Sequence, residues 1–390
     1  FTTLLRCPNI TKINWARLSH DIIRSSVFLT CNAAFFIFFI CRVRSWLGFW
    51  ITPSVGFLNG LLASFFAILI ERKKRRPMLA LYLTNLASEV SYRMLANRGY
   101  VRPIPHGQVL LFSLAMAGYM YMLRADQLDD EITKILNLLY ANSPTSNVLP
   151  VRQLPAPLAR LLLRLRKVDK PHAKCAHRHS CVSASVETFI RNFGVGFGLS
   201  SILTLLGSAS KLRSQPLSVI RSLFAYRNLS LPLALGGMAA SYKAVVCSVH
   251  QIYGVDNVRV HAAAGAVSGL ALIFYPSISV AMYVLWKFIE IMFNKAVDKS
   301  LFPRIPHGDT ILYTFSTAFC LFAGCVEPHA LRQGYWKFLC GLTGSNFEHV
   351  YRRALDMHGW DSSRSYPDFI PKLDPMHTTW NPIFFPKSQL

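Results

Sequence analysis

Apolar runs separated by short basic or proline-containing stretches dominate the chain, and their lengths suit a lipid bilayer. A helix of about 18 residues rises about 27 Å at ~1.5 Å per residue, close to the ~30 Å of a bilayer core. Such runs cover residues 25–41, 53–70, 77–96, 106–123, 189–206, 231–249, 261–274, 278–293 and 307–326. The pattern predicts an all-α, polytopic membrane protein with about nine transmembrane helices.

Part of the sequence occurs twice in the chain. The stretch Ile104-Pro105-His106-Gly107 returns as Ile305-Pro306-His307-Gly308, 201 residues later. Further identities at the same offset join Tyr82 to Tyr283, Glu89 to Glu290, Leu111 to Leu312 and Ala117 to Ala318. We interpret these matches as an internal duplication of a helical bundle. The predicted domains are residues 1–124 (first transmembrane repeat), 125–180 (basic, proline-containing linker), 181–327 (second transmembrane repeat) and 328–390 (peripheral C-terminal tail).

Composition and charge support a membrane environment. The chain is 52% hydrophobic and only 16% charged, against about a quarter charged in typical soluble domains. The net charge of +23 would suggest nucleic acid in a soluble protein. Here the basic residues lie between apolar runs, as in proteins that border anionic head groups. The lipid bilayer is therefore the expected partner, and nucleic acid is not.

A glycine pair recurs within the predicted repeats. Gly56-x-x-x-Gly60 in the first half matches Gly265-x-x-x-Gly269 in the second, at an offset of 209. This spacing lets two helix backbones approach closely in lipid. We favour packing within the chain over a dimer interface, although a homo-oligomer is compatible with the motif.

Two acidic residues stand inside predicted membrane helices. Glu89 has Arg93 one turn further on, and Glu290 has Lys287 three residues before it. A buried carboxylate in a duplicated membrane fold is a candidate proton or ion site. A structural ion pair near the head groups is the favoured interpretation, because each acid has a partner on its own helix.

The repeated corners, Pro105-His106-Gly107 and Pro306-His307-Gly308, precede predicted helices. There a side chain can cap free N–H groups, so a cap or turn is favoured over a catalytic role.

A short stretch before residue 181 is rich in zinc-ligand types. It contains Cys175, His177, His179 and Cys181. Their spacing matches no standard closed zinc site. We therefore favour a juxtamembrane thiol that is free, acylated or disulfide-bonded over a metal site. Nine scattered cysteines, an odd number, indicate reducing surroundings rather than a secreted disulfide framework. No nucleotide-binding or hydrolase motif is present, so neither an enzyme nor a cofactor is expected.

Several longer stretches carry a family resemblance, namely residues 67–73, 189–193, 331–339 and 368–375. On these the chain resembles the transmembrane protein 135 family of mitochondrial and peroxisomal membranes. The helical repeats are also similar, more weakly, to the Tim17/Tim22/Tim23 translocase family. The resemblance implies a multi-pass protein that influences mitochondrial fission and fusion, peroxisome organisation and lipid metabolism, with fission and fusion proteins as partners. The family's Cys-rich amino-terminal segment is expected to be absent from this chain, and Cys175 and Cys181 match a second Cys-rich stretch.

Three functional classes remain to be separated. A regulator of organelle dynamics is the first, and a solute or lipid transporter or Tim17-like translocation pore is the alternative. The substitutions Glu89→Gln and Glu290→Gln separate them, since a transporter would lose its substrate flux. A membrane enzyme that uses the histidine and cysteine stretch is the third class, and it predicts bound zinc.

Overall fold

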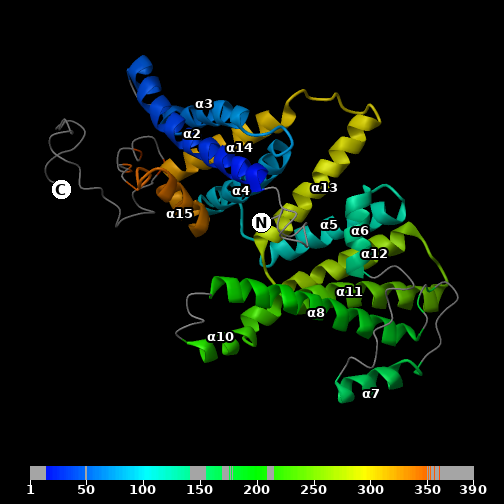
Figure 1. Ribbon diagram of the computed structural model, residues 1–390. Helices are drawn as coiled ribbons and strands as arrows, with labels where there is room; N and C mark the ends of the chain where they lie inside the picture. The colour runs from blue at the N-terminus through cyan, green and yellow to red at the C-terminus, as the bar shows by residue number, and fades with distance from the viewer. Residues whose placement is uncertain are drawn as a thin grey trace. The chain divides into compact units, whose positions relative to one another are not determined.

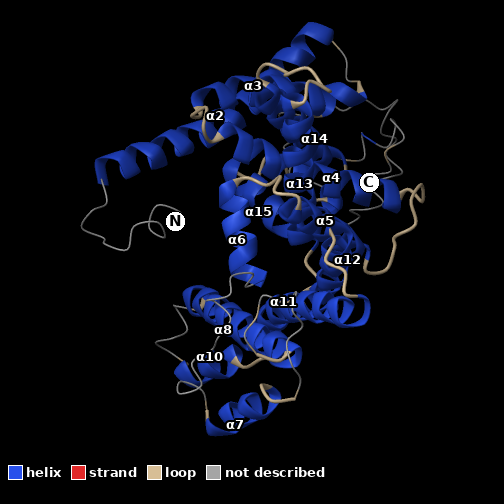
Figure 2. Cartoon of the chain, turned by 90° about the vertical axis from the view of Figure 1, so that its right-hand side faces the viewer, coloured by secondary structure: helices blue, strands red, loops and turns tan. Residues whose placement is uncertain are grey.

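The computed structural model in Figure 1 describes residues 15–48, 51–140, 155–168, 175, 177, 179–208, 215–348, 350, 352, 355 and 360. Within these ranges every regular element is helical, and Figure 2 draws no strand among them. The all-α prediction is confirmed.

Four stretches of these ranges are long and apolar enough to cross a membrane, namely Leu18–Leu47, Cys181–Gly207, Leu217–Tyr253 and Gly308–Val326. Two shorter apolar helices, Phe57–Ile70 and Val258–Phe274, fall below this length. The first has 14 residues and rises only about 21 Å, less than a ~30 Å bilayer core. The structure therefore supports a membrane protein with four candidate spans, while the larger number of about nine stays a prediction.

The chain divides into two compact units that do not follow its order. Unit 1 combines Phe1–Arg102 with Arg304–Leu390, and unit 2 is Pro103–Pro303. The chain passes from one unit to the other at residues 102–103 and 303–304, and each of these borders lies just before one of the repeated Pro-His-Gly corners. The predicted domain borders near residues 124 and 181 therefore do not coincide with the borders of the units.

Unit 1 is a helical bundle built around α14. Its described helices are α2 (Trp15–Leu47), η2 (Thr52–Val55), α3 (Phe57–Ile70), α4 (Arg76–Asn97), α14 (Gly308–Val326), η5 (Pro328–Ala330) and α15 (Gln333–Leu342). The α14 helix packs against both α3 and α4, and α2 packs against α3. Cys320 and Ala323 on α14 are fully buried, as are Ala67 and Ile68 on α3.

Proline and glycine set the ends of these helices. Pro77 stands in the first turn of α4, where a missing N–H costs no hydrogen bond. Gly99 follows the same helix with a positive φ of 76°, the left-handed conformation that ends a helix. The apolar run predicted for residues 77–96 therefore becomes a helix with nearly those limits.

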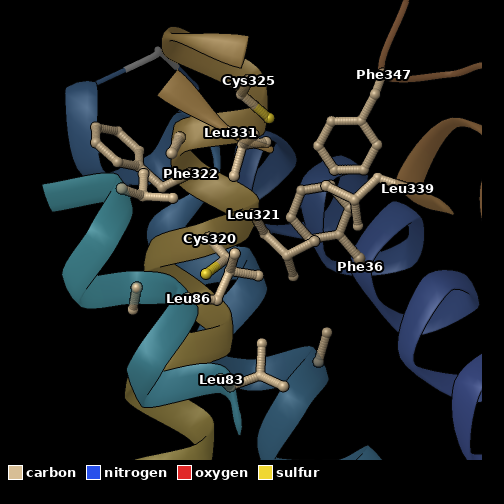
Figure 3. Packing of buried hydrophobic residues seen from close by; sticks show 14 of the residues in the cluster. Phe36, Leu83, Leu86, Cys320, Leu321, Phe322, Cys325, Leu331, Leu339 and Phe347 are labelled. Carbon is tan, nitrogen blue, oxygen red and sulfur yellow. The ribbon is translucent and has the colours of Figure 1, made fainter. Parts of the chain in front are cut away.

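Residues 328–348 are packed into unit 1, which differs from the prediction of a peripheral tail over 328–390; most of the later residues of that tail lie outside the described ranges. Leu339 of α15 and Phe347 are both only 2% exposed. The ring of Phe347 stacks on Phe36 of α2 with centroids 5.4 Å apart. Figure 3 shows these side chains converging with Leu321 of α14. The aromatic residues of this otherwise polar segment supply enough apolar surface to join the core.

Unit 2 holds the remaining described helices. They are α5 (Gly107–Arg124), α6 (Asp130–Tyr140), α7 (Ala156–Leu165), α8 (Cys181–Gly207), α10 (Pro216–Leu223), α11 (Tyr226–Tyr253), α12 (Val258–Gly269), η4 (Leu270–Phe274) and α13 (Ile278–Asp298). The α5 helix packs against α12 and α13, and α11 packs against α8, α12 and α6. Figure 1 shows α8 and α11 side by side.

The α8 and α11 helices run antiparallel. Ser200 of α8 donates a hydrogen bond to the carbonyl oxygen of Asn228 at 2.9 Å, near the start of α11. A Cβ atom on Gly196 would lie 2.8 Å from Pro232 Cα, so the two backbones nearly touch there. This close pairing places the first residue of α8, Cys181, beside the last third of α11.

Candidate functional site

Glu89 lies at the centre of a buried ion network in unit 1. Its side chain is 1% exposed and projects from α4. Arg93, one turn further on, donates from Nη2 to Glu89 Oε1 at 2.5 Å. Arg332 donates from Nε to Glu89 Oε2 at 2.5 Å. The network thus ties α4 to the segment between η5 and α15, as a structural ion pair does.

Glu290 has different surroundings, although it occupies the equivalent sequence position. It lies in unit 2 on α13, and its carboxylate is 2.9 Å from Lys287 Nζ. About a third of each side chain is exposed (33% and 36%). This pair is a surface ion pair, which is typically worth little. The two acids that the sequence pairs therefore have separate partners and differ in burial.

Two more acids of unit 1 are buried, and sequence reasoning did not single them out as sites. Glu71, 2% exposed, ends α3 and contacts Arg75 at 3.5 Å. Glu327, 4% exposed, follows α14 and forms an ion pair with Arg98. Each buried acid of this unit in the described ranges therefore has an arginine partner. Such pairing compensates for removing the charge from water.

An apolar cavity of about 380 Å³ lies in unit 1 between α2, α4, α14 and α15. Its walls include Phe28, Ala33 and Leu339. The main polar feature is a hydrogen bond from Asn32 Nδ2 to Tyr313 Oη at 3.2 Å. A mostly apolar wall with a few polar groups is typical of sites that bind small apolar molecules.

The two corners have the same backbone geometry. His106 has φ 56° and ψ 23°, and His307 has φ 56° and ψ 27°, both left-handed. Neither imidazole caps its helix through a hydrogen bond, so of the predicted cap or turn the described residues form the turn. The turn itself is present, and the N–H of Gly107 and of Gly308 donates to the carbonyl oxygen of the isoleucine three residues earlier, at 3.1 and 3.3 Å.

The paired glycines pack against helices of the same chain. A Cβ atom on Gly60 would lie 3.0 Å from Ala318 Cα of α14. One on Gly265 would lie 2.6 Å from the carbonyl oxygen of Met116 in α5. Gly56 and Gly269 meet α14 and α5 in the same way. These glycine faces are therefore covered within their own units.

The structure brings three of the four residues of the Cys/His stretch together and adds a fourth that sequence reasoning missed. Cys175, His177 and Cys181 meet Cys247 of α11, and their ligand atoms all lie within 4.8 Å of one another. His177 Nε2 is 3.3 Å from Cys247 Sγ. Burial lowers the pKa of His177, which favours the neutral ring. His179 takes part through its carbonyl oxygen instead of its ring.

Comparison with known proteins identifies one family. No solved structure matches the chain. Residues 2–96 match the family model for the N-terminal cysteine-rich region of Transmembrane protein 135. The expectation that this chain lacks that cysteine-rich segment is wrong, because the match covers residues 2–96. Through this region, which spans 95 of the 390 residues, the chain is similar to the transmembrane protein 135 family.

Proposed function

We propose that the chain is a multi-pass protein of mitochondrial and peroxisomal membranes. It regulates the balance of mitochondrial fission and fusion and the organisation of peroxisomes, with a link to lipid metabolism and without an enzymatic activity of its own. The observation that carries this proposal is the match of residues 2–96 to the transmembrane protein 135 family. Four apolar helices of bilayer length support the membrane setting. The proposed partners are the bilayer and proteins of the fission and fusion machinery.

Re-expression in cells that lack the protein tests this function. The full chain is expected to restore both the mean length of mitochondria and the number of peroxisomes, measured by fluorescence microscopy. Fractionation should recover the chain in both organelles, in the fraction that resists carbonate extraction. A chain that is present in both membranes but changes neither quantity would contradict the proposal.

We also propose that the two halves of the chain are copies of one helical bundle. The equal conformations of His106 and His307 support this. A second support does not depend on identical residues: Gly99 and Ser300, again 201 apart, both have positive φ, 76° and 58°. The next amide in each half donates back across the helix end, from Tyr100 to Leu95 and from Leu301 to Ala296, at 3.0 and 2.9 Å.

The helix contacts follow the same correspondence. In unit 1, α3 and α4 pack against α14, and in unit 2, α12 and α13 pack against α5. By sequence, α14 corresponds to α5, so each unit holds the final helix of the other half. The copies thus exchange their last helix at the Pro-His-Gly corners. In this proposal the shorter apolar helices also lie in the bilayer, which raises the number of embedded helices toward nine.

The apolar cavity of unit 1 favours a second function, the binding or transport of a lipid. Replacing Ala33, which lines the cavity, by phenylalanine is expected to lower affinity for a fluorescent fatty acid about tenfold. The added ring displaces about two CH2 groups of the ligand, each worth ~0.8 kcal/mol when buried. The neighbouring residue Ala34 is exposed on the same helix, so Ala34→Phe is the matched control. Equal affinity in both variants would exclude this cavity as the binding site.

A flux assay in liposomes separates the regulator from the transporter. The variant with both Glu89→Gln and Glu290→Gln is compared with the unchanged chain at equal amounts of folded protein. A regulator carries no flux that depends on these acids. Loss of a substrate flux in the double variant would favour the transporter.

A further inference from the structure

Four side chains with metal-binding atoms converge where α8 begins and α11 approaches its end. Cys175 and His177 precede α8, Cys181 is its first residue, and Cys247 projects from α11. Cys175 Sγ is 4.0 Å from Cys181 Sγ, and His177 Nε2 is 3.3 Å from Cys247 Sγ. The four ligand atoms thus surround one point although they come from three different parts of unit 2.

These separations fit a tetrahedral zinc ion. Zinc holds sulfur at ~2.3 Å and nitrogen at ~2.0–2.1 Å, so two sulfur ligands of one ion lie about 3.8 Å apart. The observed Cys175 Sγ–Cys181 Sγ distance of 4.0 Å is close to that value. The His177 Nε2–Cys247 Sγ distance of 3.3 Å is close to the ~3.6 Å expected between a nitrogen and a sulfur ligand. All four ligand atoms lie within 4.8 Å of one another. Only small shifts of rotatable side chains are needed to bring all four atoms into coordination distance.

The histidine is held in the orientation that coordination requires. His177 donates its Nδ1–H to the carbonyl oxygen of His179 at 2.6 Å. This bond leaves Nε2 without a proton in the neutral ring, and Nε2 is the atom that faces Cys247. A ligating histidine typically has such a partner on its other nitrogen. A second imidazole, His250, lies with Nδ1 3.5 Å from Cys175 Sγ and can donate to a thiolate there.

The charge around the cluster is also suitable. Zinc with three thiolates and one neutral imidazole carries a net charge of about −1. Lys243 lies one turn before Cys247 on α11 and is only 8% exposed. Its ammonium group would offset this charge near the cluster.

We propose that Cys175, His177, Cys181 and Cys247 bind one zinc ion in a closed structural site. Thiolate and imidazole ligands in a tetrahedral arrangement select zinc over calcium or magnesium. Four protein ligands leave no position open for water or substrate, so the ion is structural. It fastens the segment before α8 to the far end of α11 and so holds this antiparallel pair together. The site is independent of the proposed organelle function.

Metal analysis of the full chain, purified in detergent without chelators, tests the site. Mass spectrometry of the metal content is expected to find about one zinc per chain. Cys247→Ser should lower the zinc retained after an EDTA wash at least about tenfold. Cys41, exposed on α2 in unit 1, provides the control, and Cys41→Ser should retain the zinc of the unchanged chain.

Because a Cys247→Ser chain that fails to fold would also lose zinc, a second measurement uses the unchanged chain. Alkylation of Cys175, Cys181 and Cys247 is followed by peptide mass spectrometry. A zinc chelator is expected to speed their alkylation at least about tenfold, while Cys41 reacts at the same rate with and without chelator. A chain that contains no zinc, takes up none when Zn²⁺ is added and shows no chelator effect would overturn the proposal. A disulfide between Cys175 and Cys181, seen as a mass lower by two hydrogens, would overturn it as well.

Discussion

Gly269→Ala is expected to lower the free energy of unfolding by about 1–3 kcal/mol. The new Cβ atom would lie 2.4 Å from Ser113 Cα and 2.8 Å from Ser113 Oγ. Because the nearest atom is backbone, relief requires α12 and α5 to move apart, which opens contacts along the whole pair. Alanine favours the helix over glycine by only about 1 kcal/mol. The clash is therefore expected to exceed the gain in helix propensity.

The control is a glycine in a helix with open space beside it. A Cβ atom on Gly194 of α8 would have no neighbouring atom within 4 Å, so Gly194→Ala should be neutral or stabilise by up to about 1 kcal/mol. A Cβ atom on Gly60 would lie 3.0 Å from Ala318 Cα, so the stability of Gly60→Ala should fall between the stabilities of these two variants. Thermal unfolding in detergent, followed by circular dichroism, measures all three. If Gly269→Ala unfolds at the temperature of Gly194→Ala, the close approach of α5 and α12 is wrong.

Local features explain why many helices could be predicted from the sequence. The run predicted for residues 307–326 becomes α14, Gly308–Val326, because the corner before it and Pro328 after it define its ends. The run 261–274 differs, since it continues past Gly269 as the 3-10 helix η4. Proline, glycine and apolar periodicity act over a few residues, so they are visible in the chain itself.

Contacts between distant residues explain what the sequence could not reveal. Arg332 is 243 positions from Glu89, and no spacing rule joins them. Cys247 stands in the apolar run of α11, where a cysteine is expected to act as a small hydrophobe. Only the antiparallel packing of α8 on α11 brings it to the other three side chains. The assignment of α14 to unit 1 likewise depends on packing between halves of the sequence.

Glu89→Gln is expected to lower the free energy of unfolding of the chain by about 2–4 kcal/mol. Removing one partner of a fully buried ion pair costs about 3–5 kcal/mol, because the remaining charge is left uncompensated. The cost here is lower, since the side chains of Arg93 and Arg332 are 39% and 24% exposed and keep some contact with water. Glutamine has nearly the same shape, so the change removes the charge with little effect on packing.

The equivalent position in the other half supplies the matched control. Glu290→Gln should cost less than about 1 kcal/mol, because the side chains of Glu290 and Lys287 are each about a third exposed. Arg332→Ala should lower the free energy of unfolding less than Glu89→Gln does, because Glu89 keeps its partner Arg93. The double variant Arg93→Ala and Arg332→Ala leaves the buried carboxylate of Glu89 without a partner, so it should lower the free energy of unfolding most. Unfolding by denaturant in detergent orders these variants. Equal losses of free energy of unfolding for Glu89→Gln and Glu290→Gln would show that burial does not distinguish the two acids. The ion network of Glu89 would then not be what holds α4 to the segment before α15.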